Sequence, residues 1–455
     1  MGILKTIYNI SPIFIQNIAV SLSGYIKNRS RYGKTYYKHR KFLEEFDSWS
    51  LQDKLDYQFK ELVRFISYAK NNSKYYNNLY KDIDLSEIKS LEDLKMLPIV
   101  SKEDIRLNIK DVITTNKGAI TSHTGGTTGK SLVVTMTKND MMKRMAMLDH
   151  FKSRVGYEHL KMRRATFNGK PIVPPKQKKK CFWRYNKACK QMIYSPFHLS
   201  EDNMKYYVQS LNKFKPKAID GFFMAIVDLA SYIERNNLEL KFQPIAIFPT
   251  SETLTTSGRK LIERVFKCKV YDQYASSEGA PFVTECKHQK LHMELSSGVF
   301  EHYKNDNDEI LVTSFTTHGT PLIRYQIDDA MVFDSKNTKC VCGSDSILVD
   351  KIQGRKLDFL LTADGVKIYS VNVANLFKNI PNVIIRSQVV QNKLDEVDIY
   401  LEVDKEKYLN IFDNQIKDEF LQMFGKKTHV NIYHVDEIER EISGKFRFIK
   451  NNIIM

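Results

Sequence analysis

The stretch TSHTGGTTGKS, residues 121–131, decides how this chain is interpreted, because it holds glycines, hydroxyls and one lysine but no apolar side chain. Such a loop cannot help to build a core, whereas its backbone N–H groups, hydroxyls and ammonium group are suited to holding a polyphosphate. A Walker A loop needs a glycine five residues before Gly129, and the chain has Thr124 there. The stretch therefore predicts a phosphate-binding loop outside the P-loop NTPases. A flexible Gly/Thr connector is the alternative.

Length and composition indicate a globular protein with more than one domain. The chain has 455 residues, of which 42% are hydrophobic and 27% charged. A chain of this length usually divides into domains with separate hydrophobic cores, and the composition argues against long disordered segments. The 6 cysteines are too few and too scattered for a disulfide scaffold, so we expect a reducing compartment and a cytoplasmic location.

The net charge of +17 predicts contact with anions. The densest basic run lies within residues 170–190 and is not accompanied by helix-turn-helix spacing, a zinc finger or an RNP-type motif. We therefore expect no nucleic acid partner. Nucleotide or CoA phosphates, an anionic membrane surface or an acidic glycan account for the charge equally well.

The first residues carry a helical apolar pattern, because Ile7, Ile10, Phe14 and Ile18 recur at near-helical spacing. Polar residues and Pro12 interrupt the segment, so no transmembrane helix is expected. We expect a helix packed on its own domain. Peripheral contact with a membrane or a partner is the alternative.

The remaining chain predicts an α/β fold with a smaller C-terminal unit. Residues 35–75 have helical apolar spacing, and apolar strands follow at 132–137, 244–250 and 309–315. An Asp364–Gly365 turn marks a hairpin within residues 349–369. Strands at 397–403 and 428–434 flank a helix at 415–424. We expect a large multi-sheet domain over 1–353, with a helical segment at 1–80, and a mobile α+β lid over 354–455.

Four further polar clusters lie in loops or at strand ends. They are TSET (250–253), YDQYASSEGAP (271–281), GTPLIRYQIDDA (319–330) and REISGKFRF (440–448). Glu278 at a strand end suits Mg²⁺, which prefers hard oxygen ligands shared with phosphates. Asp329 follows an apolar strand and suits ribose hydroxyls, and Lys445 offers a cation. Each of these three residues has a purely structural alternative. Glu278 could be an acid at a helix start, Asp329 could form a surface pair with Arg324, and Lys445 could be one of many solvated lysines.

In this ordered set the chain resembles the acyl-adenylate-forming superfamily, in its phenylacetate–CoA ligase branch. Within that branch it most resembles the CapK-like proteins of capsular polysaccharide biosynthesis. The motif positions that match are Gly126, Thr127, Thr128, Gly129, Lys130, Tyr274, Ser277, Glu278, Asp329, Gly354, Arg355, Asp358, Ser443, Gly444 and Lys445. Gly125, Ala275 and Ile327 depart from the family pattern and affect the expected fit of the nucleotide.

The resemblance implies an ATP-dependent, AMP-forming carboxylate ligase that uses Mg²⁺. The implied catalytic residues are Lys445, Thr127, Lys130 and Glu278, with Glu278 as the Mg²⁺ ligand and Asp358 as the hinge of the lid. The implied nucleotide-binding residues are Thr124, Gly125, Gly126, Thr127, Thr128, Gly129, Lys130, Ser251, Glu252, Tyr274, Ser277, Glu278, Asp329 and Arg355. The acyl pocket is expected at Phe222, Phe223, Met224 and Ser276, although packing in a core explains the first three equally well.

The expected substrate is a small carboxylic or amino acid, and CoA is favoured slightly as the acceptor. An amide-forming ligase that acts on an amino sugar without CoA is the first alternative, and a non-catalytic, membrane-associated scaffold is the second. The resemblance to CapK-like proteins further implies a role in surface polysaccharide biosynthesis or modification.

Two short Cys/His groups predict a structural zinc site. Cys286, His288 and His292 lie about fifty residues before Cys340 and Cys342, which suits a tetrahedral ion. The preferred ligands are Cys286, His292, Cys340 and Cys342, with His288 as a substitute. Unliganded cysteines in strands and turns are the alternative.

Overall fold

The computed structural model of the chain describes residues 2–115, 119–123, 132–175, 177, 179–303, 308–334, 339–355, 359–377, 379–441 and 444–453. The chain divides into two compact units. The first contains Met1–Gly24, His159–Tyr271 and Gln353–Met455, and the second contains Tyr25–Glu158 and Asp272–Ile352. Each unit is therefore assembled from segments that are distant in sequence.

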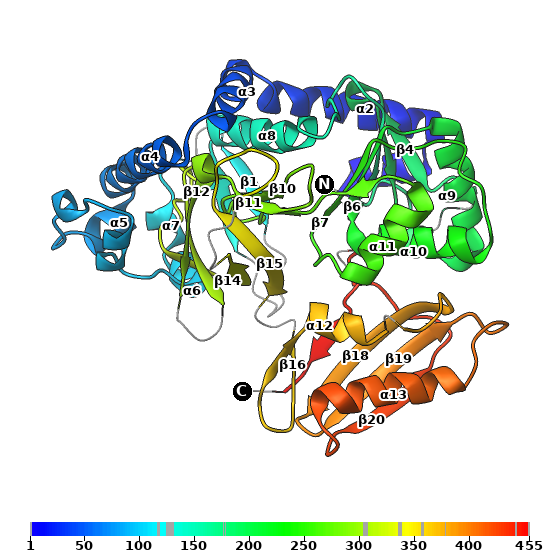
Figure 1. Ribbon diagram of the computed structural model, residues 1–455. Coiled ribbons are helices and arrows are strands. Elements are labelled where there is room, and N and C mark those ends of the chain that lie inside the picture. Colours follow the sequence, from blue (N-terminus) through cyan, green and yellow to red (C-terminus); the bar gives the residue numbers. More distant parts are fainter. Residues whose placement is uncertain are drawn as a thin grey trace. The chain divides into compact units, whose positions relative to one another are not determined.

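The first unit is built around a six-stranded sheet with the strand order β4-β5-β3-β6-β7-β8. Strands β5, β3, β6, β7 and β8 run parallel, and β4 is an antiparallel edge strand. Helices alternate with these strands and lie beside them in green in Figure 1. The bounds are β3 Arg164–Phe167, β4 Trp183–Asn186, β5 Gln191–Tyr194, α9 Glu201–Phe214, β6 Ala218–Phe222, α10 Phe223–Arg235, β7 Ala246–Thr250, α11 Thr256–Phe266 and β8 Lys269–Val270.

The C-terminal segment of the same unit forms its own small sheet, orange and red in Figure 1. The strand order is β20-β19-β18-β21, and Ile416, Phe420 and Phe424 of α13 share a core cluster with residues of β18 and β19. A separate hairpin joins β16 and β17 across the turn that contains Gly365. The bounds are β16 Phe359–Leu361, β17 Lys367–Tyr369, α12 Ser370–Ala374, β18 Ile384–Lys393, β19 Glu396–Val403, α13 Ile411–Phe424, β20 His429–His434 and β21 Ile449–Asn451.

The second unit contains a seven-stranded sheet, ordered β12-β13-β14-β15-β11-β10-β9, and the two-stranded β1-β2. Two of its long helices begin with side-chain caps: Ser50 accepts from the Asp53 N–H at the start of α4, and Thr137 and Asp140 form a capping box at the start of α8. The bounds are α3 Lys34–Asp47, α4 Leu51–Asn72, α5 Lys74–Leu79, α6 Lys102–Leu107, α7 Ile109–Val112, β1 Ile120–His123, β2 Val133–Met136, α8 Lys138–Ser153, β9 Gln273–Tyr274, β10 Val283–Glu285, β11 Leu291–Met293, β12 Gly298–His302, β13 Glu309–Ser314, β14 Tyr325–Phe333 and β15 Leu348–Arg355.

Most predicted elements are present. The helical region at 35–75 is formed by α3 and α4, and the strands predicted at 132–137, 244–250 and 309–315 are β2, β7 and β13. Within residues 349–369 the predicted hairpin is shorter than expected. Strand Leu348–Arg355 belongs to another sheet, where Leu348 and Val349 pair with β11, and only β16 and β17 form the hairpin. The α/β class is the one that the sequence predicts.

The prediction for the N-terminal helices is wrong in one respect. Residues Gly2–Ile10 form α1 and Ile13–Arg31 form α2, as the apolar spacing indicates. The apolar side chains of that pattern do not pack on the domain, because Ile7, Ile10, Phe14 and Ile18 are all exposed. Periodicity predicts an apolar face but does not determine what covers it. Among the described residues, no helix combines the length and the apolar character needed to cross a membrane.

Candidate active site

The predicted phosphate loop connects two paired strands. Residues 124–131, which include Thr124 to Lys130, lie outside the described residues. On either side, β1 and β2 pair antiparallel, from Ile120 opposite Met136 to His123 opposite Val133. This pairing fixes both ends of the loop, as a hairpin does.

The segment 316–320 packs tightly against β2. The Thr135 N–H donates to Thr320 Oγ1 at 2.9 Å. A Cβ atom on Gly319 would lie 2.4 Å from the carbonyl oxygen of Thr135, so only glycine permits this approach. Asp140, the capping residue of α8, also accepts from His318 Nδ1 at 2.7 Å. The strand that leaves the predicted phosphate loop is therefore held by residues almost two hundred positions away.

A buried arginine donates hydrogen bonds to the backbone of the loop that carries Glu278. Arg144 Nη1 donates to the carbonyl oxygens of Gly279 at 2.8 Å and Ala280 at 2.9 Å. Burial lowers the pKa of Arg144 to about 10, which still leaves the guanidinium charged at neutral pH. Gly279 has a φ of +106°, and a Cβ atom there would lie 2.6 Å from Thr317 Cγ2. Glu278 itself is buried, with 7% exposure.

The serines before Glu278 differ in their roles. Ser276 Oγ accepts from the N–H groups of Gly279 at 3.2 Å and Ala280 at 3.0 Å, so it stabilises the turn. Ser277 is exposed to solvent. The hydroxyl of Ser276 is thus engaged within its own loop, and its assignment to the acyl pocket stays a prediction.

Two predicted nucleotide-binding residues meet directly. The Tyr274 hydroxyl donates to Asp329 Oδ2 at 2.7 Å, although the two residues are 55 positions apart. Tyr325 lies near the same carboxylates. Burial raises the pKa of the Tyr325 phenol, and the charges of Glu278, Asp328 and Asp329 raise it further. Glu278, in the loop after β9, and Asp328 and Asp329 of β14 therefore all act on the same buried phenol. Arg324 forms its ion pair with Glu301, which does not support the surface-pair alternative for Asp329.

In the first unit, Glu252 joins the end of β7 to the segment that carries Lys445. Its carboxylate accepts from the N–H groups of Met224 at 2.8 Å and Phe446 at 3.1 Å. Burial raises the pKa of the Glu252 carboxyl, opposed by these hydrogen bonds and by the charges of Arg440 and Lys445. The sequence resemblance assigns Glu252 to the nucleotide, but these two hydrogen bonds engage it with the protein backbone.

The contacts of the other predicted site residues in this unit do not indicate a ligand. Phe222 and Phe223 are buried in a core cluster, and Met224 packs partly buried against it, so packing accounts for the two phenylalanines. Ser251 is exposed and has a φ of +70°. The side chain of Arg355 and the whole of Asp358 lie outside the described residues.

Ion pairs attach the C-terminal segment to α10. Arg386 Nε donates to Asp228 Oδ2 at 3.2 Å, and Arg440 pairs with the same carboxylate. Asp228 is almost fully buried, with 2% exposure. Removing the Asp228 carboxylate would take one partner from each of the two arginines, which makes Asp228 the centre of this attachment. No sequence motif indicated it.

The four preferred metal ligands converge. One ligand atom from each of Cys286, His292, Cys340 and Cys342 lies within 4.8 Å of the others. The Sγ atoms of Cys286 and Cys340 are 3.7 Å apart, as are Cys342 Sγ and His292 Nε2. Two thiolates bound to one tetrahedral zinc, each about 2.3 Å from the ion, lie about 3.8 Å apart. The donor set therefore fits zinc, whereas His288 is exposed and outside the cluster.

The surroundings of the cluster are typical of metal sites. Backbone N–H groups of His288 and Ser344 donate to the sulfurs of Cys286 and Cys342, each at 3.4 Å. The second ring nitrogen of His292 hydrogen-bonds to Ser346 Oγ, which fixes the ring. Burial lowers the pKa of His292 to about 4, so the ring is neutral at neutral pH.

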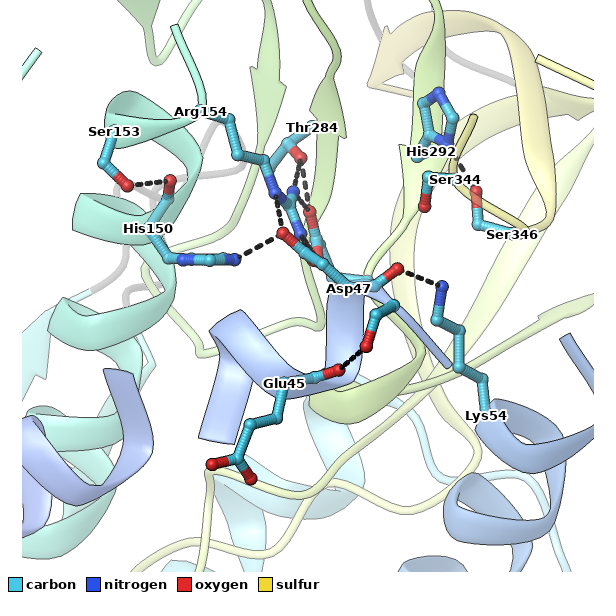
Figure 2. Close-up of polar contacts among 12 residues, drawn as sticks. Glu45, Asp47, Lys54, His150, Ser153, Arg154, Thr284, His292, Ser344 and Ser346 are labelled. Carbon is cyan, nitrogen blue, oxygen red and sulfur yellow. Dashed lines mark hydrogen bonds and ion pairs between the residues drawn. The ribbon is translucent and has the colours of Figure 1, made fainter. Parts of the chain in front are cut away.

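A buried network of charges lies next to this cluster (Figure 2). Lys54 donates to the carbonyl oxygens of Asp345 at 2.7 Å and Asp47 at 3.2 Å. Asp47 in turn accepts from Arg154 Nη2 at 2.5 Å, and Arg154 also pairs with Glu294. Burial opposes the charged forms, yet these partners lower the pKa of Asp47 and of Glu294. The network connects α3, α4 and α8 to the Cys/His loop.

Comparison with known proteins identifies the family to which this chain belongs. Residues 360–452 match the family model described as the CapK C-terminal domain. The chain is 40% identical to Protein CapK of Staphylococcus aureus over 454 residues, which is 99% of this chain and 100% of that protein. The chain belongs to the CapK family. Together with a more distant relative, a phenylacetate-coenzyme A ligase, this match supports the adenylate-forming superfamily that the sequence resemblance implies.

Two further comparisons extend to coenzyme A ligases. The chain is 22% identical to a phenylacetate-coenzyme A ligase of Thermus thermophilus over 396 residues, covering 80% of this chain and 85% of that protein. The structure matches 2-hydroxyisobutyryl-CoA ligase in the postadenylation state in complex with R3-HIB-AMP. The TM-score is 0.73 at 15% identity, over 89% of this chain and 91% of that chain. The predicted α/β fold class is thereby confirmed.

Proposed function

We propose that this CapK family member uses ATP to activate a carboxylic acid as an acyl-adenylate and then transfers the acyl group to an acceptor. The similarity to a phenylacetate-coenzyme A ligase over 80% of this chain supports an enzyme of the ATP-dependent, AMP-forming ligase class, as the sequence predicts. The observation that carries the proposal is the 2.7 Å hydrogen bond between Tyr274 and Asp329. It supports one nucleotide site formed by two motifs that are distant in sequence.

In the first step, the formation of the acyl-adenylate, each predicted site residue would have a separate role. A carboxylate oxygen of the acid bonds to the α-phosphorus of ATP while the bond from that phosphorus to the pyrophosphate oxygen breaks. Asp329 would hold the ribose, and Thr127, Thr128 and Lys130 would hold the outer phosphates. Lys445 would stabilise the charge that develops between the carboxylate and the α-phosphate. Glu278, a buried carboxylate, would hold Mg²⁺, which supplies positive charge to the phosphates when bound.

The second step transfers the acyl group. We favour the thiol of CoA, which would attack the acyl carbon and displace AMP. The related Thermus thermophilus protein is a phenylacetate-coenzyme A ligase, and this supports the choice. A domain boundary at 353/354 and a rotation of 354–455 about Asp358 would separate the two steps, as in lid-type enzymes. An amide-forming reaction on an amino sugar is the alternative.

The wider setting is part of the proposal. A role in surface polysaccharide biosynthesis or modification is carried over from the sequence resemblance to CapK-like proteins, and the identity to Protein CapK is consistent with that resemblance. The structure records all 6 cysteines as free, which agrees with a reducing compartment such as the cytoplasm.

The test is pyrophosphate release from ATP with a panel of carboxylic and amino acids. Each acid is offered alone, with CoA and with amino sugars. The proposal expects acid-dependent release, with turnover increased by one acceptor class. Stimulation by an amino sugar but not by CoA would replace the thioester reaction with the amide-forming alternative. ATP hydrolysis that no acid changes would contradict the whole proposal.

A structural zinc ion bound by Cys286, His292, Cys340 and Cys342 is a second proposal. The 3.7 Å Sγ–Sγ and Sγ–Nε2 separations carry it. The ion would brace β11 and the 339–348 loop without taking part in the reaction. Protein purified without chelator should contain one zinc per chain by elemental analysis, and Cys342→Ser should lower both zinc content and melting temperature. Cys268→Ser, at a free cysteine outside the cluster, is the control. Metal-free protein with an unchanged melting temperature would refute the site.

A further inference from the structure

A continuous row of apolar side chains on α1 and α2 faces solvent. The row, called here the apolar stripe, consists of Leu4, Ile7, Ile10, Phe14, Ile18 and Leu22. Their exposures are 79%, 52%, 79%, 64%, 62% and 59%, respectively. Single exposed apolar residues are ordinary on protein surfaces, but a contiguous row of large ones marks an interaction surface. All six belong to the first compact unit.

The opposite side of α2 is attached to the protein by polar side chains. Asn17 Oδ1 accepts from the Tyr185 N–H at 2.9 Å, and Ser21 Oγ accepts from the Lys187 N–H at 3.0 Å. The buried Gln16 accepts from Arg184 Nε at 2.5 Å. These bonds pair the free edge of β4 and so protect it from other strands.

The two helices therefore expose their apolar side and turn polar side chains toward the protein, which is the reverse of the usual orientation. An amphipathic helix on a soluble protein normally buries its apolar side and exposes its polar side. Here the polar groups on α2 have specific partners in the fold, including the backbone of an edge strand. A rotation that buried the stripe would break those bonds, so the exposure of the stripe is built into the structure.

The charge around the stripe is positive. No Asp or Glu precedes Glu44, and basic residues lie at both ends of the stripe: Lys5 at its start, and Lys27, Arg29 and Arg31 after Leu22 at the end of α2. Lys5 is exposed next to Leu4. The exposed Lys187 follows the edge strand that α2 covers, with its N–H bonded to Ser21. An apolar row with basic margins is complementary to a surface that has an apolar interior and anionic headgroups.

We propose that α1 and α2 bind the surface of a bilayer that contains anionic lipid. The stripe would enter the boundary between headgroups and acyl chains, while Lys5 and Lys187 contact the headgroups. Pairing of the stripe with a second copy of the chain is disfavoured, because a two-fold contact would bring the same basic margins together. This inference does not depend on the ligase reaction.

The test is co-sedimentation of the full-length protein with vesicles of phosphatidylglycerol and phosphatidylcholine in equal amounts. Pure phosphatidylcholine vesicles are the neutral comparison. The double variant Phe14→Glu/Ile18→Glu should lower partitioning onto the anionic vesicles at least about tenfold, because both side chains lose apolar contact and the new charges are repelled. Leu107→Glu, at a residue of α6 that is 67% exposed, is the matched control and should bind like the parent protein. Added salt should weaken binding of the parent protein.

The alternatives give different results. Both changed positions are exposed, so the double variant should keep its circular dichroism spectrum and melting temperature. Failure of the parent protein to bind anionic vesicles would overturn the proposal. Equal binding by the double variant would also overturn it. A concentration-dependent dimer in light scattering that the double variant abolishes, without lipid binding, would assign the stripe to a second copy of the chain.

Discussion

Replacing Asp329 with alanine should weaken ATP binding by about two orders of magnitude. In the structure the Asp329 carboxylate accepts a 2.7 Å hydrogen bond from Tyr274, which leaves acceptor capacity for the two ribose hydroxyls. A hydrogen bond to a charged group contributes about 1.5 to 3 kcal/mol. Asp329 is only half-buried, so we take the lower value for each hydroxyl, about 3 kcal/mol in all. That corresponds to a loss of about 150-fold in affinity.

The measurement is isothermal titration of ATP, or of a non-hydrolysable analogue, into each variant. Tyr274→Phe removes only the hydroxyl that positions Asp329, so its loss should be about fivefold, equivalent to about 1 kcal/mol. Asp328→Asn removes one negative charge from the neighbouring exposed residue and is the control. It avoids placing alanine at the φ of +61° that Asp328 adopts. ATP affinity of Asp329→Ala within threefold of the parent value would refute the assignment of the ribose site.

Two further predictions concern the supports of the site. Gly279→Ala should lower the free energy of unfolding by about 2 kcal/mol and reduce acid-dependent pyrophosphate release. The new methyl group would meet Thr317 Cγ2 at 2.6 Å, on a backbone with a φ of +106°. The urea midpoint and the rate of pyrophosphate release measure the two effects, and an unchanged midpoint would contradict the prediction. Glu294→Gln should destabilise the protein by about 2 kcal/mol, because Arg154 would keep Asp47 but lose its second carboxylate partner. The lowered pKa of Glu294 and of Asp47 means that their stabilisation is complete above the usual carboxyl pKa of about 4 and is lost as pH falls below it. Unfolding between pH 3 and pH 7 should therefore depend less steeply on pH in Glu294→Gln, and parallel curves for the two proteins would be contrary to this expectation.

The elements that the sequence predicts well are those with strong local patterns. The helices at 35–75 and the strand at 244–250 follow from apolar periodicity, which reports one face of a helix or a buried strand directly. The convergence of the four preferred metal ligands could be predicted because cysteine and histidine are rare and their spacing is informative. The Tyr274–Asp329 pair was accessible only through the family resemblance, because nothing local connects residues 55 positions apart.

The parts that sequence reasoning missed depend on long-range contacts. Arg144 supports the Glu278 loop through backbone carbonyls 135 and 136 positions away, so no pattern of side chains marks it. The Arg154 pairs with Asp47 and Glu294 span 107 and 140 positions. The N-terminal helices were predicted as helices, but their orientation depends on polar bonds to β4, which periodicity does not encode.

The central claim is that the chain forms an acyl-adenylate with help from Lys445. Acid-dependent exchange of labelled pyrophosphate into ATP measures that step alone, without an acceptor. We predict exchange with the cognate acid in the parent protein and in Lys427→Ala, a change at an exposed lysine elsewhere in the C-terminal segment. Lys445→Ala should lose the exchange while still binding ATP. Full exchange by Lys445→Ala, or none by the parent protein with any acid, would contradict the claim.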